Sequence, residues 1–282
     1  LAYMLWAIWL SALYTRYYAE RLTSSIYTTV SNNIIILFTL IPIAYMLRSG
    51  FTVIARMSEV LLPFIGGMLV LLSVFLLPSI RTDNVLPVSI SDVIPMFKAS
   101  LSTTSILAYL FLLFFLSDKI VNMKSLKTFG YIATYINISS VVLVNFITIG
   151  VLGYSVTQRA PLPVLITVKQ VSLLDTIENI EAIIIAIWIF ADFTLISTML
   201  VVALNLLKSL FRLSDTKPLI NILVILVYFL SLGISSDKFE LEEFSNVLLI
   251  PINITLGYVF PLILFLTNVV KQKYKKTTAQ KN

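Results

Sequence analysis

Long runs of apolar residues separated by short polar segments dominate this sequence. A helix that crosses a membrane needs about 20 mostly apolar residues, and eight runs approach or exceed that length. They lie near residues 1–18, 31–47, 58–80, 99–117, 129–152, 182–207, 218–234 and 247–270. The alternation of polar and apolar residues that is typical of outer-membrane barrels is absent. The pattern predicts an all-α, polytopic membrane bundle: a single transmembrane domain over 1–270, followed by a tail over 271–282.

The composition supports a membrane protein and narrows its chemistry. Of the 282 residues, 59% are hydrophobic and only 12% are charged, which is too little charge to cover the surface of a soluble domain. The chain contains neither cysteine nor histidine, so thiolate or histidine metal sites and the usual catalytic triads are excluded. We therefore expect no enzyme activity, no metal and no cofactor. Nucleic acid binding is not expected either, because the basic residues are scattered between apolar runs.

The distribution of positive charge predicts the orientation of the chain. Cytoplasmic loops of membrane proteins carry an excess of Lys and Arg, and thirteen of the twenty basic residues fall on one side of the predicted spans. These thirteen are Arg48, Arg56, Lys119, Lys124, Lys127, Lys208, Arg212, Lys217, Lys271, Lys273, Lys275, Lys276 and Lys281. We therefore expect both ends of this chain, including the basic tail over 271–282, to be cytoplasmic.

The sequence begins inside an apolar run. Leu1 is not preceded by an initiator methionine, a basic segment or a signal-peptide cleavage site. We expect further sequence before Leu1, and two additional spans there would preserve the even number.

One carboxylate, Asp192, stands in the middle of the apolar run "EAIIIAIWIFADFTLIS" (181–197). An ionised Asp near the middle of a bilayer costs about 2.5–3.5 kcal/mol, so it is expected to face a partner or a polar cavity. Glu181 lies eleven residues earlier, on nearly the same helical face and about 16 Å away along the axis. Trp188 belongs to the same stripe. Asp192 either holds the bundle together, protonated or bonded to a neighbouring helix, or binds an amine or cation; the sequence leaves both open.

Other predicted spans carry polar stripes that could face Asp192. Ser11, Tyr14 and Tyr18 share one face of the first span, and the fourth span begins with "SLSTTS" (100–105), which ends at Ser105. The fifth span has a stripe of Thr134, Asn137, Asn145 and Thr148. Such residues often only join helices through hydrogen bonds. Four prolines also fall within predicted spans, where they can kink a helix or free backbone groups for a ligand; they are Pro42, Pro63, Pro251 and Pro261.

Two stretches resemble a known family. "GFTVIARMSEVLLPF" (50–64) and "PLPVLITVKQVSLLDTIENIEAIIIAIWIFADF" (161–193) are similar to the permease-like B subunits of nutrient germinant receptors, which are spore germination proteins of the amino acid permease superfamily. The resemblance extends over essentially the whole chain. It implies a fold of ten helices in two inverted five-helix repeats, of which the eight spans here are the third to the tenth.

The resemblance also implies where a ligand binds. In that family the first and sixth helices are interrupted, and with the third and eighth they line a site for an amino acid or similar germinant. The fourth span here corresponds to the sixth helix, and "ILAYLF" (106–111) places Tyr109 where the family usually has an acid. The candidate ligand-binding residues are Asp192, Trp188, Tyr109, Ser105, Ser11 and Tyr14, with Glu181 at the outer mouth.

The function implied by the resemblance is that of a receptor subunit in the inner membrane of the spore. It binds a small nutrient germinant and signals to an A-type membrane subunit and a C-type lipoprotein to start germination. Two alternatives remain: a secondary amino acid transporter that couples flux to an ion or proton at Asp192, and a truncated structural subunit that binds no ligand.

Overall fold

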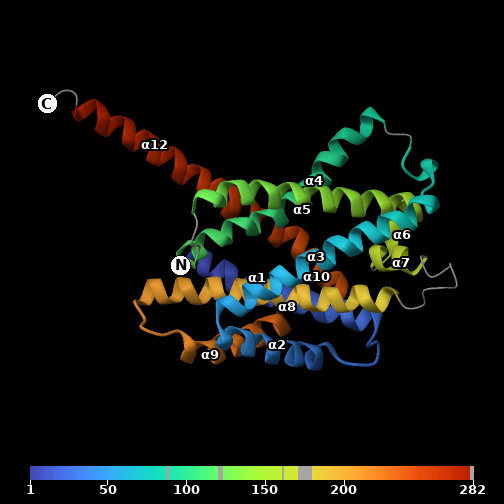
Figure 1. Cartoon of the computed structure of the whole chain (residues 1–282), viewed down its shortest axis with the longest axis horizontal. Coiled ribbons are helices and arrows are strands. Elements are labelled where there is room, and N and C mark those ends of the chain that lie inside the picture. Colours follow the sequence, from blue (N-terminus) through green and yellow to red (C-terminus); the bar gives the residue numbers. More distant parts are fainter. Residues whose placement is uncertain (87–88, 120–122, 161, 171–179, 280–282) are drawn as a thin grey trace.

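The structure is a computed structural model that describes residues 1–86, 89–119, 123–160, 162–170 and 180–279; for residues 123–124, 180–181 and 273–279 it describes the backbone alone. Within these ranges every regular element is a helix (Figure 1). The α-helices are α1 (Ala2–Ser25), α2 (Asn32–Ser49), α3 (Phe51–Leu76), α4 (Val93–Leu107), α5 (Met123–Leu152), α6 (Tyr154–Arg159), α7 (Pro163–Lys169), α8 (Ile180–Phe211), α9 (Lys217–Ile234), α10 (Lys238–Phe244), α11 (Ile250–Ile254) and α12 (Phe260–Ala279). Four 3₁₀ helices, η1 (Leu77–Ser79), η2 (Thr82–Asn84), η3 (Ile90–Asp92) and η4 (Ala108–Lys119), and two π-helical turns, η6 (Ser245–Leu249) and η7 (Thr255–Val259), complete the described elements.

Seven helical segments of the described chain are long and apolar enough to cross a membrane, which confirms the all-α membrane bundle. They cover the predicted spans from 31–47 to 247–270. The predicted span at 1–18 lies in α1, which is a continuous helix but is not among the seven. The reason is its composition, because four tyrosines and several hydroxyl and charged residues lower the mean hydropathy of α1. Its polar residues Ser11, Thr15 and Arg16 are buried in the bundle. In the described chain seven segments therefore qualify by length and hydropathy, and α1 as an eighth span stays a prediction.

The core of the bundle forms around α1. This helix packs against α2, α8 and α9, and α3 packs against α8 (Figure 1). The largest fully buried side chains include Leu10 and Leu13 of α1, Ile36 of α2 and Leu200 of α8. Dense packing of this kind, rather than removal of apolar surface from water, is what associates helices in a bilayer.

The turn between α2 and α3 depends on a glycine. Gly50 has a φ of 92°, a conformation that residues with a Cβ rarely adopt. It lets α3 begin directly at Phe51, so α3 starts well before the predicted span at 58–80.

The fourth predicted span changes its helical form at the place that the family resemblance marked. The α-helix α4 ends at Leu107, and the chain continues as the 3₁₀ helix η4 for 12 residues. Runs of 3₁₀ helix longer than three or four residues are uncommon and often mark a hinge or strain. The segment contains neither glycine nor proline, so no sequence signal announces this change.

The last predicted span contains two π-turns, and its prolines explain both. A proline has no N–H to donate to the carbonyl four residues earlier. Pro251 thereby frees the carbonyl of Val247 within η6, and Pro261 frees the carbonyl of Gly257 within η7. The segment from α10 to α12 is therefore one long helix widened at two points, and α12 extends away from the rest of the bundle (Figure 1).

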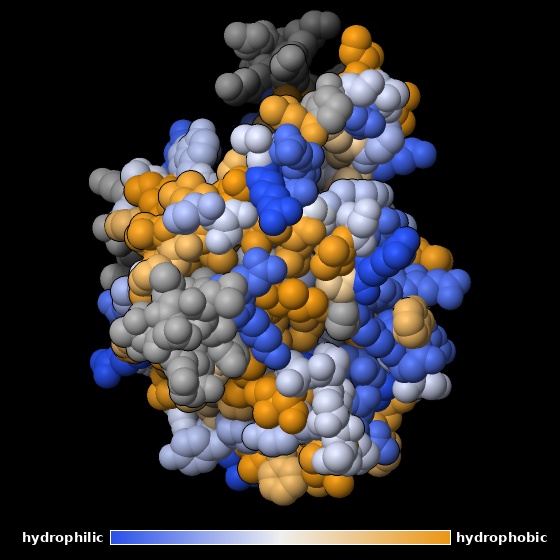
Figure 2. Space-filling model, turned by 90° about the vertical axis from the view of Figure 1, so that its right-hand side faces the viewer, coloured by the Kyte–Doolittle hydropathy of each residue, from blue (hydrophilic) through white to orange (hydrophobic). Residues whose placement is uncertain are grey.

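The outer surface of the bundle is rich in exposed apolar side chains. Phe38, Tyr45, Phe229 and Phe265 are all more than 60% exposed. Figure 2 looks at the end of the bundle where α3 ends and α8 begins, and there hydrophilic residues spread between the hydrophobic ones. Apolar sides with a more polar end are the surface that a bilayer requires.

Candidate functional site

The carboxylate in the middle of α8 is paired with an arginine of α1. Asp192 Oδ2 accepts a hydrogen bond from Arg21 Nη1 at 2.6 Å, and the two side chains are 11% and 27% exposed. The Arg21 guanidinium also lies over the ring of Trp188, 5.5 Å from its centre. A carboxylate, a cation and an aromatic face thus form one site on α1 and α8, and the pairing explains how an apolar helix tolerates the acid.

Sequence reasoning missed Arg21, because the first predicted span ends near residue 18. The signal was nevertheless present, because Arg21 continues the polar stripe of Tyr14 and Tyr18 at helical spacing, and α1 extends to Ser25. The residue of α1 that bonds to Asp192 is therefore Arg21, which lies beyond the predicted stripe and beyond the predicted end of the helix.

A chain of hydrogen bonds links α1, η4 and α11. Tyr14 Oη donates to Tyr109 Oη at 3.1 Å, and Asn253 Nδ2 donates to the same Tyr109 oxygen at 3.1 Å. Trp6 Nε1 donates to Asn253 Oδ1 at 2.9 Å. Asn253 is fully buried between the two π-turns. The chain connects Tyr14 and Tyr109, both predicted site residues, to the irregular part of the last long helix.

Close packing reinforces this connection. A methyl group placed on Gly257 would lie 2.4 Å from Ala108 Cβ and 3.0 Å from Ala108 Cα. Gly257 belongs to η7, and Ala108 is the first residue of η4. The π-turn and the α-to-3₁₀ junction are therefore pressed together at their backbones.

A cavity of about 280 Å³ lies beside the two tyrosines. Its polar lining comes from Tyr14, Tyr109, Asn137 of α5 and Thr198 of α8, and its remaining walls are Leu, Ile, Val and Met side chains. A mostly apolar cavity with a few convergent polar groups is the usual form of a small-molecule site. Asp192 does not line this cavity, but Leu195 does. Asp192 lies three residues before Leu195 and therefore on the same side of α8.

Comparison with known proteins identifies the family. The family model described as "Spore germination protein" matches residues 1–239. The chain belongs to this family. It is 25% identical to Spore germination protein KB of Bacillus subtilis (strain 168) over 97% of its own length and 75% of that protein. No solved structure matches the chain. Together with the seven apolar helices, these findings show a multi-pass membrane protein of the spore germination family.

Two predicted site residues of this spore germination protein use their hydroxyls within their own helices. Ser11 Oγ donates to the carbonyl of Ala7 at 2.8 Å, and Ser105 Oγ donates to the carbonyl of Ser102 at 2.7 Å. Both serines are buried and neither lines the cavity. Both hydroxyls thus bond to the backbone of their own helix, which is common for serine in membrane helices. Glu181 lies in the first turn of α8, and its side chain is outside the described part of the chain.

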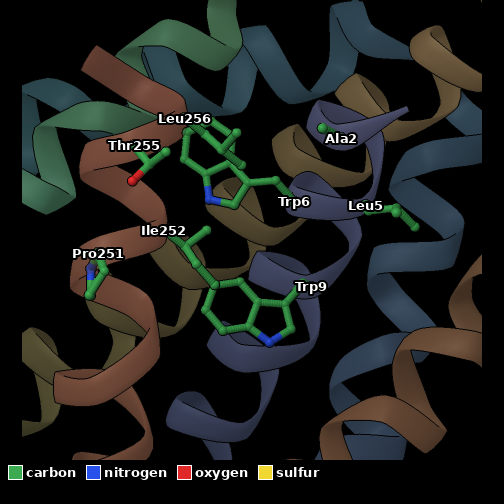
Figure 3. Close-up of a pocket in the computed structure, with 8 residues that line it drawn as sticks. All are labelled: Ala2, Leu5, Trp6, Trp9, Pro251, Ile252, Thr255 and Leu256. Carbon is green, nitrogen blue, oxygen red and sulfur yellow. The ribbon is translucent and has the colours of Figure 1, made fainter. Parts of the chain in front are cut away.

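A second groove in this family member is apolar. It has a volume of about 480 Å³ and runs between the start of α1 and the segment α11–η7. Figure 3 shows the rings of Trp6 and Trp9 directed toward Ile252 and Leu256 across it. It contains no charged side chain. Among the described residues no group of three or more acidic side chains could hold a metal ion.

Proposed function

We propose that this protein is a membrane subunit of a nutrient germinant receptor and that it binds a small amino acid or similar nutrient in the cavity between α1, η4, α5 and α8. One observation carries the proposal: the cavity at Tyr14 and Tyr109 is lined in part by α1 and α8, the two helices that hold the Arg21–Asp192 pair. The cavity offers hydroxyl and amide groups for hydrogen bonds and an apolar wall for a side chain.

Asp192 supplies the ammonium partner in this proposal. Its present partner, Arg21, is more than one quarter exposed, and its guanidinium lies over the ring of Trp188. A ligand ammonium that reaches Asp192 finds the same carboxylate and the same aromatic face that now hold the guanidinium. Exchange of one cation for another keeps the buried carboxylate paired throughout, which avoids the cost of a buried unpaired charge.

The signal leaves the cavity through Tyr109. A ligand that bonds to Tyr14 or Tyr109 competes with the hydrogen bond between Tyr109 and Asn253. Since Asn253 lies between two π-turns, its release changes the balance between two arrangements of the last long helix. We propose that an A-type membrane subunit and a C-type lipoprotein read this change in the spore inner membrane, with both ends of this chain in the cytoplasm.

The experiment is ligand binding to the purified protein in lipid nanodiscs. A panel of amino acids is titrated while the fluorescence of the tryptophans is followed, since Trp188 lies beside the proposed ammonium site. We expect saturable binding by at least one member of the panel, about tenfold weaker binding by Tyr14→Phe, and unchanged binding by Tyr45→Phe. Tyr45 is a matched control because it is 74% exposed on the outer surface of α2. If Tyr14→Phe binds as tightly as Tyr45→Phe, the ligand does not bind in this cavity.

A transporter is the second candidate, because a buried carboxylate and irregular helices are also what alternating access requires. Uptake of the bound nutrient into proteoliposomes decides between the two. Net flux driven by an ion gradient favours the transporter, whereas binding without flux favours the receptor. Correctly folded protein that binds no nutrient would favour the structural subunit.

A further inference from the structure

A second charged cluster lies on a different face of α1. Arg16 Nη2 donates to Glu20 Oε1 at 2.8 Å and to the carbonyl of Ser236 at 3.0 Å. Asn32 Nδ2 donates to the same Glu20 oxygen at 2.6 Å. The cluster therefore ties α1 to the first residue of α2 and to the segment that follows α9. Arg16 is only 3% exposed, and it lies five residues before Arg21, which turns it away from the Asp192 site.

Three buried polar atoms of this cluster are met by no protein group in the described residues. They are Arg16 Nε, Asn32 Oδ1 and the hydroxyl of Ser235, which is 4% exposed. These are the buried side-chain polar atoms without a partner in the whole described chain. Nε shares a carbon with the bonded nitrogen of Arg16, Oδ1 shares a carbon with the bonded nitrogen of Asn32, and Ser235 precedes the Ser236 carbonyl that Arg16 holds. The three atoms thus belong to residues of one hydrogen-bonded cluster, or next to it in the chain, between α1, α2 and the end of α9.

The hydrogen-bonding capacity of these three atoms defines which kind of ligand can bind to them. Arg16 Nε offers a hydrogen, Asn32 Oδ1 offers only lone pairs, and a hydroxyl offers both. The charges of Arg16 and Glu20 already balance, so a charged ligand would leave one uncompensated buried charge. An anion would oppose the oxygens of Asn32 and Glu20, and a cation would oppose the guanidinium. The matching ligand is neutral, small, and both donor and acceptor.

We propose that Arg16, Asn32 and Ser235 form a binding site for ordered water, which bridges α1 to α2 and to the segment between α9 and α10. Water makes two to four hydrogen bonds to buried polar groups in such positions. The site fixes the α1 end that carries Arg21, and it does so independently of any nutrient in the cavity.

The test uses the sign of a stability change in the purified protein in nanodiscs. If Ser235 bonds to water, Ser235→Ala removes a made hydrogen bond and lowers the thermal midpoint by about 2 °C or more. If its hydroxyl is unpaired, the same change relieves a buried polar group and raises the midpoint. Ser231→Ala is the matched control, because Ser231 is also buried near the end of α9 but donates to the carbonyl of Tyr228 at 2.7 Å.

A midpoint of Ser235→Ala equal to or above that of the unaltered protein would overturn the proposal. The second measurement is an experimental structure of the unaltered protein at a resolution that shows ordered water. Density within hydrogen-bond distance of both Arg16 Nε and the Ser235 hydroxyl is expected. Direct contact of these atoms with a protein group, or density that appears only with sodium and is too strong for water, would overturn it as well.

Discussion

The pair between Arg21 and Asp192 leads to the sharpest prediction. The change is Asp192→Asn, which keeps the size of the side chain and its ability to accept a hydrogen bond but removes the charge. Two unit charges about 4 Å apart attract by about 4 kcal/mol at an effective dielectric constant near 20. Removal of one partner from a fully buried pair costs about 3–5 kcal/mol.

The structure lowers this figure. Asp192 is 11% exposed and Arg21 is 27% exposed, so the guanidinium left behind recovers part of its solvation. It also keeps its contact with the Trp188 ring. We therefore expect Asp192→Asn to reduce the free energy of unfolding by about 2–3 kcal/mol, below the range for a fully buried pair.

The assay is a double-mutant cycle with Arg21→Gln, followed through thermal or denaturant unfolding of the protein in detergent. Either single change leaves one charge unpaired, whereas the double change leaves none, so the double variant should be more stable than the sum of the single effects predicts. Glu243→Gln removes an exposed acid as a control. Strict additivity of the two changes, or a single-variant cost as small as that of the control, would refute the pairing.

Two further changes probe the contact between η4 and the last long helix. Gly257→Ala places a methyl group 2.4 Å from Ala108 Cβ and should lower the free energy of unfolding by about 1–3 kcal/mol. The control is Gly66→Ala, which has open space around it and should leave the stability unchanged or raise it. Their unfolding midpoints are compared, and equal midpoints would contradict the close packing. Tyr109→Phe removes the oxygen that accepts a hydrogen bond from Asn253. Because the buried amide then lacks a partner, the free energy of unfolding should fall by about 1–3 kcal/mol in the same measurement. A stability equal to that of the unaltered protein would contradict this hydrogen bond.

The sequence by itself determined the membrane architecture and singled out Asp192 as a residue that needs a partner. The number of apolar residues in a run is a local property, and the cost of exposing a backbone to lipid leaves the helix as the form such a run takes here. The same cost singles out a carboxylate in the middle of an apolar helix. For these reasons the predicted spans from 31–47 onward appear as long helices, and Asp192 is buried beside another helix.

The tertiary structure alone decided which groups meet. Arg21 and Asp192 are 171 residues apart in the chain, and Asn253 and Tyr109 are 144 apart. Whether a polar residue of a helix turns toward a partner helix or bonds to its own backbone depends on how the helices are rotated against each other. Ser11 and Tyr14 illustrate this: they share one predicted stripe, yet Ser11 bonds to its own helix and Tyr14 reaches η4. Hydropathy is a property of one helix and contains no information on which residues of two helices meet, so helix packing decides these contacts.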